Sequence, residues 1–297
     1  MRVAVTGSHG LIGTALLAAL RSAGHEAVAI VRGPPARGEI GWDPRAGQLA
    51  TRSLVGVDAV VNLAGAGIGD RRWSDEYKRT VLESRTRATT LLADTMAGLE
   101  GGPGVLLSGS AIGFYGDRGD DELDETSPPG TGFLAEVAEA WEATTAPASE
   151  AGLRVVNLRT GIVLAGQGGA LPRMLPLFKV GLGGRFGSGR QWMSWIALDD
   201  EVGAILHLLG SDVVGPVNLT APAPVRNAEL ADTIGDVLHR PTVLPVPAFG
   251  PKLLLGGERA DALLFESQRV LPTVLQADGY EFRFPTLEPA LRAALAR

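Results

Sequence analysis

The chain has 297 residues, of which 45% are hydrophobic and 20% are charged, a composition typical of a folded globular protein. The formal net charge of −6 and the lack of basic runs argue against a nucleic-acid partner. The absence of cysteine excludes disulfides and thiolate nucleophiles, and the four scattered histidines argue against a metal site. We expect no signal peptide, no membrane-spanning run and a cytoplasmic location.

Short apolar segments alternate with helical patterns along the first two thirds of the chain. After an opening strand at residues 3–5 and a helix that ends at Gly24, the expected elements are strands at 25–31, 57–65, 104–108, 153–159 and 216–220 and helices at 74–96, 131–149 and 198–209. Residues 33–47, between the expected strands at 25–31 and 57–65, are rich in proline and glycine and too polar for a core helix. This rhythm predicts an α/β protein with a Rossmann-type, doubly wound parallel sheet.

The last third of the chain has a different character. Residues 166–189 are rich in glycine, 241–251 are rich in proline, and 227–297 contain short helices with few strands. We therefore predict a smaller, mostly helical C-terminal substrate lobe beside a dinucleotide-binding domain. The predicted boundaries are 1–166 with 194–222 for the cofactor domain, and 167–193 with 223–297 for the lobe. Ligands are expected at the carboxyl edge of the sheet.

A glycine-rich turn follows the first strand in the pattern T-G-x-x-G-x-x-G. Glycine lets the backbone take unusual φ values and approach a ligand closely, and the following helix directs its N-terminus at that ligand. Between a strand and a helix, this pattern predicts a dinucleotide site. The residues expected to contact the cofactor are Thr6, Gly7, Gly10, Leu11, Ile12, Gly13, Arg32, Leu63, Ala64, Gly65, Arg85 and Ser108.

The choice between NAD and NADP depends on the end of the second strand, which usually meets the adenosine ribose. Arg32 follows Val31 there, and no acidic residue stands at this end. An arginine suits the 2′-phosphate of NADP, and a charge-assisted contact corresponds to roughly a 10–100-fold preference. NADP(H) is therefore the predicted cofactor, with a solvated loop arginine as the alternative reading.

Several segments resemble the extended short-chain dehydrogenases/reductases, the superfamily of NAD(P)-dependent nucleotide-sugar epimerases and dehydratases. The glycine turn and the segments 62–65 (N-L-A-G) and 108–116 (S-G-S-A-I-G-F-Y-G) carry this resemblance. A narrower resemblance, to the "epimerase family protein" subgroup with its own C-terminal domain, is carried by residues 72–74, 83–85, 181–184, 187–196, 267–272 and 279–285. The resemblance covers essentially the whole chain and implies a Rossmann-type cofactor domain with an NADP preference.

The resemblance also implies catalytic residues that the chain lacks. The superfamily usually uses a Tyr-x-x-x-Lys pair on a helix, with a Ser or Thr near the preceding strand, to move a proton as hydride passes to or from the nicotinamide. In this chain the corresponding helix has Leu134 and Ala138 at the positions of the pair. Its Glu136 and Glu139 are expected on a solvated face.

The residues expected to replace the missing catalytic pair lie beside the strand that ends near Ser108. We predict Tyr115 and Ser110 as catalytic residues, because the Tyr115 phenol would approach a substrate that lies over the nicotinamide and Ser110 would lie beside it. A packing aromatic with a satisfied hydroxyl is the alternative for Tyr115. Asp199 and Asp200 are expected at the start of the helix at 198–209, where carboxylates commonly cap.

A glycine-rich segment with arginines and tryptophans gives the predicted substrate contacts. Arginine recognises phosphate or carboxylate, and tryptophan offers a flat stacking face. The predicted substrate-binding residues are Arg185, Arg190, Gln191 and Trp192. An interdomain hinge with packed tryptophans is the alternative.

Two functions remain open from the sequence. The first is an NADP-dependent oxidoreductase or epimerase that acts on a small polar, nucleotide-sugar-like substrate. The second is an NADPH-binding sensor or regulatory protein that has lost catalysis with the Tyr-x-x-x-Lys pair. Homodimerisation through the two long helices is implied by the resemblance, but their charged outer faces leave the oligomeric state open.

Overall fold

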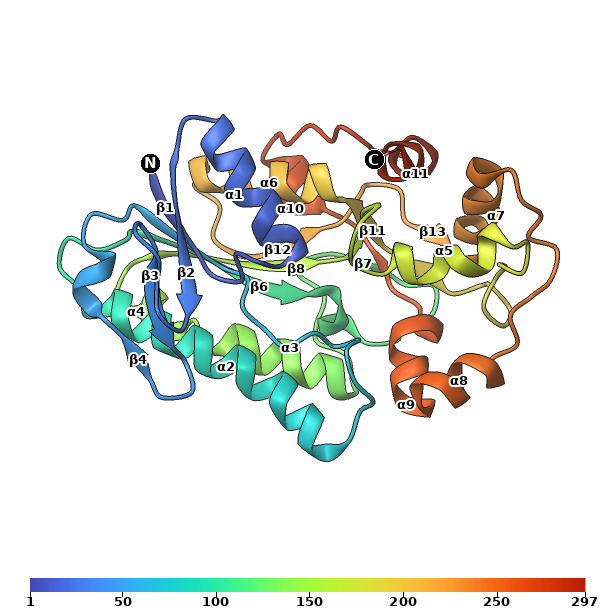
Figure 1. Ribbon diagram of the computed structural model, residues 1–297, viewed down its shortest axis with the longest axis horizontal. Helices are drawn as coiled ribbons and strands as arrows, with labels where there is room; N and C mark the ends of the chain where they lie inside the picture. The colour runs from blue at the N-terminus through green and yellow to red at the C-terminus, as the bar shows by residue number, and fades with distance from the viewer. Residues whose placement is uncertain (297) are drawn as a thin grey trace. The chain divides into compact units, whose positions relative to one another are not determined.

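The computed structural model describes residues 1–296, and these form a mixed α/β structure around an eight-stranded sheet (Figure 1). The strands of this sheet are β1 (Arg2–Val5), β2 (Glu26–Arg32), β3 (Ile40–Asp43), β4 (Gln48–Leu49), β5 (Ala59–Asn62), β6 (Val105–Ala111), β8 (Arg154–Thr160) and β12 (Gly215–Leu219). Their order across the sheet is β12-β8-β6-β5-β1-β2-β3-β4. The predicted Rossmann-type α/β fold is therefore confirmed.

The strands at the centre of the sheet are parallel. β1 pairs with β2 and β5, and β5 pairs with β6 so that Asn62 stands opposite Ser108. Residues 3–5 of β1 are fully buried, as a central parallel strand covered on both faces requires. The pair β3 and β4 is antiparallel and was not predicted, because it lies in and beside the Pro/Gly-rich stretch. Ile40 and Trp42 alternate there with polar or small residues and are buried.

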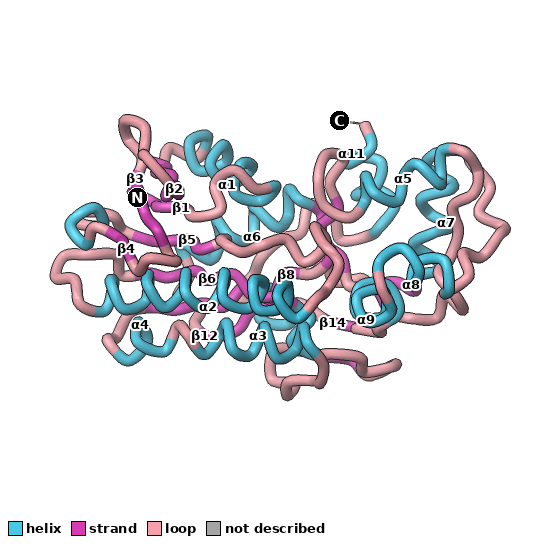
Figure 2. The backbone as a smooth tube through the Cα atoms, turned by 60° about the horizontal axis from the view of Figure 1, so that its bottom comes forward, coloured by secondary structure: helices cyan, strands magenta, loops and turns pink. Residues whose placement is uncertain are grey.

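Helices cover both faces of the sheet. Figure 1 shows α1 (Leu11–Ser22) on one face and α2 (Asp75–Ala97) with α3 (Phe133–Ala143) on the other. α2 and α4 (Ala146–Glu150) lie side by side (Figure 2). The buried face of α1 consists of Gly13, Leu16, Leu17 and Leu20, at the spacing of an amphipathic helix. Fully burying each leucine stabilises the fold by about 1.5–3 kcal/mol.

The helix predicted over residues 131–149 is divided into α3 and α4. The break follows from Pro147, which stands in the first turn of α4. Proline has no N–H to donate and its ring clashes with the carbonyl four residues earlier, that of Ala143, where α3 ends.

The contacts among the Cα atoms divide the chain into two compact units. The first contains residues 1–111, 136–159 and 202–217, and the second contains residues 112–135, 160–201 and 218–297. Because these units are defined by contacts and the predicted domains by function, the predicted domain boundaries stay a prediction.

The second unit contains short strands and short helices. Within it, the C-terminal region from residue 227 onward is largely helical, as expected. The strands of the second unit are β7 (Glu122–Leu123), β9 (Ile162–Leu164), β10 (Trp192–Met193), β11 (Trp195–Ala197), β13 (Val225–Arg226) and β14 (Arg269–Val270). Its helices are α5 (Leu171–Lys179), α7 (Asn227–Leu238), α8 (Phe249–Leu255), α9 (Gly257–Ala260), α10 (Thr273–Ala277) and α11 (Leu287–Leu295), while α6 (Leu198–Gly210) continues into the first unit. Leu175 of α5, Ile234 of α7 and Leu291 of α11 share one buried cluster.

Among the described residues, no helix combines the length and the apolar character that crossing a membrane requires. Nor do residues 1–296 contain a group of three or more His, Asp or Glu side chains arranged to hold a metal ion.

Candidate functional site

The turn between β1 and α1 has a backbone that only glycine accommodates at two positions. Gly7 has a φ of +62°, and a Cβ on it would lie 2.6 Å from the carbonyl oxygen of Leu63. A Cβ on Gly13 would lie 2.3 Å from the carbonyl oxygen of Gly7. The turn is closed by the Gly10 N–H, which donates to the Gly7 carbonyl over 2.8 Å. The glycine pattern therefore has a geometric cause in this structure.

The start of α1 carries the features of an anion-binding helix N-terminus. The helix begins at Leu11, followed by Ile12, and its N-cap residue Gly10 makes no side-chain capping bond. No acidic residue stands in the first turn. Amide groups without a side-chain cap, at the positive end of the helix dipole, fit the pyrophosphate of a dinucleotide.

Thr6 fastens the glycine turn to the end of β5. Its hydroxyl donates to the Asn62 side-chain oxygen over 2.7 Å and accepts the backbone N–H groups of Leu63 and Ala64 over 3.0 and 3.2 Å. Thr6 and Asn62 are both fully buried. The structure thus brings together the predicted cofactor residues of two neighbouring strands at their carboxyl ends.

A polar network that the sequence did not predict continues from Asn62 into α2 and α3. The Asn62 amide and the Trp141 indole N–H both donate to the Thr89 hydroxyl over 2.8 Å. A Cβ on Gly109 would lie 2.9 Å from the Trp141 ring, so the ring lies directly against the β6 backbone. The glycine between Ser108 and Ser110 was the one sequence signal for this close approach.

Arg85 is held by the protein around it. Its guanidinium donates to the carbonyls of Ala66 and Val81, each over 3.0 Å, and lies 5.1 Å from the centre of the Trp141 ring. Burial lowers the pKa of Arg85 to about 10, which leaves the side chain charged at neutral pH. A Cβ on Gly65 would lie 3.1 Å from this guanidinium. The contacts show that Arg85 braces the loop after β5, and its contact with the cofactor stays a prediction.

The other two predicted cofactor residues differ in exposure. Arg32 is the last residue of β2 and is exposed; within residues 1–296 its side chain makes no hydrogen bond or ion pair. Ser108 is fully buried on β6, opposite Asn62. Arg32 is thus the residue of this set whose charge remains available for a ligand.

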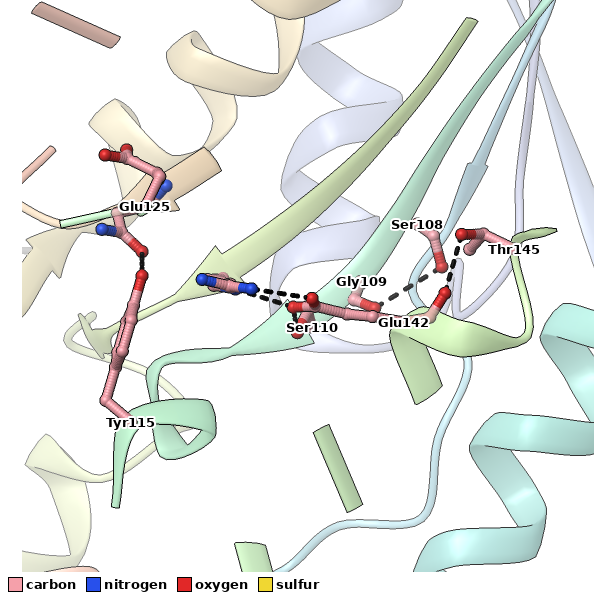
Figure 3. Close-up of polar contacts among 9 residues, drawn as sticks. Ser108, Gly109, Ser110, Tyr115, Glu125, Glu142 and Thr145 are labelled. Atoms are coloured by element: carbon pink, nitrogen blue, oxygen red, sulfur yellow. Dashed lines mark hydrogen bonds and ion pairs between the residues drawn. The ribbon is translucent and has the colours of Figure 1, made fainter. Parts of the chain in front are cut away.

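Ser110 belongs to a charged cluster within the first unit. Its hydroxyl donates to Glu142 Oε1 over 2.6 Å, and Figure 3 shows the two side chains directed at one another. Arg159 binds the same carboxylate through two nitrogens, over 2.8 Å to Oε1 and 2.9 Å to Oε2. The sequence predicted Ser110 but not Glu142 or Arg159, because the partners are 32 and 17 residues apart.

Tyr115, the other predicted catalytic residue, is fully buried. Its hydroxyl donates to the Asn218 side-chain oxygen over 2.7 Å (Figure 3), and its ring meets Phe114 edge to face. The Asn218 backbone N–H donates in turn to Glu125, whose pKa is raised by burial. These contacts favour the alternative of a packed tyrosine with a satisfied hydroxyl, and a catalytic role for Tyr115 stays a prediction.

The two helix positions at which the superfamily has its catalytic Tyr and Lys carry apolar or small residues in this chain. Leu134 is partly buried and lies against Gly113, where a Cβ would come within 3.2 Å of the leucine. Ala138 is buried. Glu136 and Glu139 on the same helix are exposed, as a solvated face requires.

The four predicted substrate residues separate into two pairs. Arg185 and Arg190 are exposed. Gln191 is buried and donates to the carbonyls of Phe186 and Leu264. The Trp192 ring is covered by guanidinium groups that the sequence did not predict there, those of Arg226 at 4.0 Å and Arg269 at 4.6 Å from its centre. Substrate binding by all four stays a prediction.

Two acidic residues at the start of α6 have structural partners. Asp200 accepts the backbone N–H groups of Arg283 and Phe284 over 2.7 and 2.9 Å. Asp199 forms an ion pair with Arg283 over 3.0 Å. The next residue, Glu201, is fully buried and accepts the Thr160 hydroxyl over 2.9 Å, and burial raises its pKa to about 8.

Comparison with known proteins identifies similarities over the whole chain. The model of the NAD dependent epimerase/dehydratase family matches residues 3–219, and a domain of unknown function matches residues 246–294. The epimerase family protein Mb2239 of Mycobacterium bovis is 46% identical over 297 residues, covering 99% of this chain and 98% of that protein.

Two solved structures share the fold and a substantial part of the sequence. The crystal structure of the human epimerase family protein SDR39U1 (isoform 2) with NADPH has a TM-score of 0.91 and 36% identity, over 100% of this chain and 99% of that one. The nucleoside-diphosphate sugar epimerase of Corynebacterium glutamicum has a TM-score of 0.82 and 39% identity, over 99% of this chain and 58% of that one.

Proposed function

The chain belongs to the NAD dependent epimerase/dehydratase family, and from this premise we propose that it is an NADP(H)-dependent oxidoreductase or epimerase. The proposed substrate is a small polar molecule of nucleotide-sugar-like character. When bound, the nicotinamide supplies or accepts a hydride. Residues of the chain bind and orient the dinucleotide, and they accept or donate the proton that is transferred together with the hydride.

The observation that carries the proposal is the fit of the glycine turn to a dinucleotide. At Gly7 and Gly13 a side chain would collide with backbone, and the uncapped start of α1 leaves amide groups for a pyrophosphate. Thr6 fixes this turn against the end of β5, after which Ala64 is partly exposed and Gly65 is exposed.

Arg32 supports NADP(H) over NAD(H). It stands at the end of β2, exposed, where an arginine in this fold accommodates the 2′-phosphate. The human relative was crystallised with NADPH, which agrees with this preference.

The substrate class rests on a different line of support. The relative from C. glutamicum is described as a nucleoside-diphosphate sugar epimerase, and the exposed Arg185 and Arg190 suit a diphosphate. Of the two predicted catalytic residues, Ser110 is the one proposed to handle the proton, because the Tyr115 hydroxyl already bonds Asn218. A cytoplasmic location and a homodimer remain predictions.

A second function is favoured by one observation: apolar or small residues, Leu134 and Ala138, occupy the positions of the superfamily's catalytic pair. A sensor or regulatory protein would bind NADPH without catalysis and would change its affinity for a partner with cofactor occupancy.

One experiment separates the two functions. The protein, saturated with NADPH or NADP⁺ as judged by calorimetry, is offered carbonyl compounds and nucleotide sugars, and absorbance reports the nicotinamide redox state. Substrate-dependent oxidation of NADPH or reduction of NADP⁺ supports the enzyme and excludes the sensor. Tight binding without any redox change, and without any epimer of the offered sugars among the products, supports the sensor.

A further inference from the structure

Ser110, Glu142 and Arg159 come from three elements and meet in one buried cluster within the first unit. The side chains of Glu142 and Arg159 are only 12% and 5% exposed. Ser110 is the penultimate residue of β6, and Arg159 is the penultimate residue of β8, the next strand in the sheet. The cluster therefore lies toward the carboxyl ends of these strands, the edge at which ligands bind in open α/β sheets.

The hydrogen bonds of the cluster assign a direction to the Ser110 hydroxyl. The Glu142 carboxylate offers only acceptors, so the Ser110 proton points at Oε1 over 2.6 Å, the length of a charge-assisted bond. Arg159 donates to both oxygens of the same carboxylate and fixes its orientation. The Ser110 oxygen thus keeps lone pairs for a further donor, and a substrate hydroxyl is such a donor.

We propose that Glu142 is the terminal proton acceptor of the reaction, reached through Ser110, and that this relay performs the task of the absent Tyr-x-x-x-Lys pair. The inference rests on the proposed function. Arg159 is a positioning residue that holds the carboxylate toward Ser110.

The relay balances for oxidation of a secondary alcohol by the oxidised nicotinamide dinucleotide. The carbinol C–H bond of the substrate breaks and its electron pair leaves as hydride to that oxidant. The O–H bond of the substrate breaks as its proton passes to the Ser110 oxygen, while the original Ser110 proton passes to Glu142 Oε1. The products are a carbonyl compound, the reduced dinucleotide and a neutral Glu142, and reduction follows the same path in reverse.

The test compares Ser110→Ala, Ser110→Thr and Glu142→Gln with the wild type. Ser110→Ala leaves the ion pair intact and interrupts the relay, and Ser110→Thr restores the hydroxyl. Glu142→Gln keeps an oxygen that accepts the Ser110 bond but takes no proton. Glu83→Gln is the control, because Glu83 forms an exposed ion pair with Arg87 on α2.

Three measurements are made on each variant: NADPH affinity by calorimetry, thermal unfolding, and NADP⁺ reduction with UDP-glucose and with simple secondary alcohols over a range of pH. We expect Ser110→Ala and Glu142→Gln to lower kcat by about 100-fold or more with NADPH affinity within about twofold of wild type. Ser110→Thr should recover a large part of the rate, and the solvent isotope effect of the wild type should report two protons in flight.

The outcomes are distinct. If Glu142→Gln is too unstable to study, Ser110→Ala decides alone, because it leaves both charges paired. Unchanged kcat in folded Ser110→Ala or Glu142→Gln would overturn the relay and assign the cluster a structural role. NADPH binding without turnover of these probes in the wild type would overturn the relay as well, whereas failure to bind NADPH would overturn the proposed function itself.

Discussion

The glycine turn after β1 and the cluster of Ser110, Glu142 and Arg159 prepare their surroundings by opposite means. The turn removes side chains, so that backbone groups lie open to a ligand and even one added methyl collides with backbone. The cluster brings charged side chains out of water and balances them against one another. The first region is therefore sensitive to volume, and the second is sensitive to unpaired charge.

The largest expected effect is the loss of charge balance in the cluster. Arg159→Met should lower the free energy of unfolding by about 3–5 kcal/mol, because it leaves the Glu142 carboxylate buried without its cation. Urea unfolding measures the change. The double variant Glu142→Gln with Arg159→Met should recover much of the loss, and Arg87→Gln on the exposed pair should cost at most about 1 kcal/mol. Equal losses in the single and double variants would contradict the charge-balance explanation.

Adding volume to the turn is the next test. Gly13→Ala places a methyl group 2.3 Å from the Gly7 carbonyl oxygen and should cost about 1–3 kcal/mol of stability. It should also weaken NADPH binding at least tenfold, measured by calorimetry, because the backbone of the turn must shift. Gly104→Ala is the control, because a Cβ on Gly104 meets no atom within 4 Å. Gly24→Ala would not serve, because Gly24 has a φ of +80°, which alanine rarely adopts. If folded Gly13→Ala bound NADPH with the affinity of the wild type, the turn would not be part of the cofactor site.

A single neutral hydrogen bond should matter less than either change. Tyr115→Phe keeps the ring against Phe114 but leaves the buried Asn218 oxygen without this donor, at a cost of about 1–2 kcal/mol in urea unfolding. We expect kcat to change less than threefold. A large drop in kcat with unaltered stability would instead support the predicted catalytic role of Tyr115.

The smallest effect concerns the pH dependence of stability. Burial raises the pKa of Glu201 to about 8 in the folded protein, so the folded state holds a proton that the unfolded chain releases near pH 4–5. The stabilisation is complete below the unfolded pKa and is lost as pH rises through the folded pKa. Stability should thus fall by about 1 kcal/mol between pH 6 and pH 7 through this group.

The check is urea unfolding at several pH values for the wild type and Glu201→Gln. The substitution should flatten this part of the profile, whereas Glu150→Gln, at an exposed position, should leave it unchanged. A profile that keeps its slope in Glu201→Gln would assign the pH dependence to other groups.

The features that could be predicted from sequence are those whose cause lies in neighbouring residues. The strands β1 and β2, the helix α1 and the turn between them follow from apolar periodicity and glycine spacing within about thirty residues. The same holds for Arg32, whose position is fixed by the strand that it ends.

What could not be predicted depends on contacts between distant segments. β3 was not predicted, because Ile40 and Trp42 give only two apolar positions in a Pro/Gly-rich stretch. Glu142 and Arg159 each have several equally plausible roles until the fold places them together. Trp192 was expected to offer an open face, but β13 and β14 bring Arg226 and Arg269 over its ring.

The most direct test of cofactor binding is a calorimetric titration of the cofactor-free protein with NADPH and with NADH. We expect NADPH to bind roughly 10–100-fold more tightly, since Arg32 would form a charge-assisted contact with the 2′-phosphate. Arg32→Ala should abolish that preference while Arg21→Ala, an exposed arginine in the last turn of α1, preserves it. Equal affinities in the wild type would contradict the role of Arg32, and no binding of either nucleotide would contradict the proposed function as a whole.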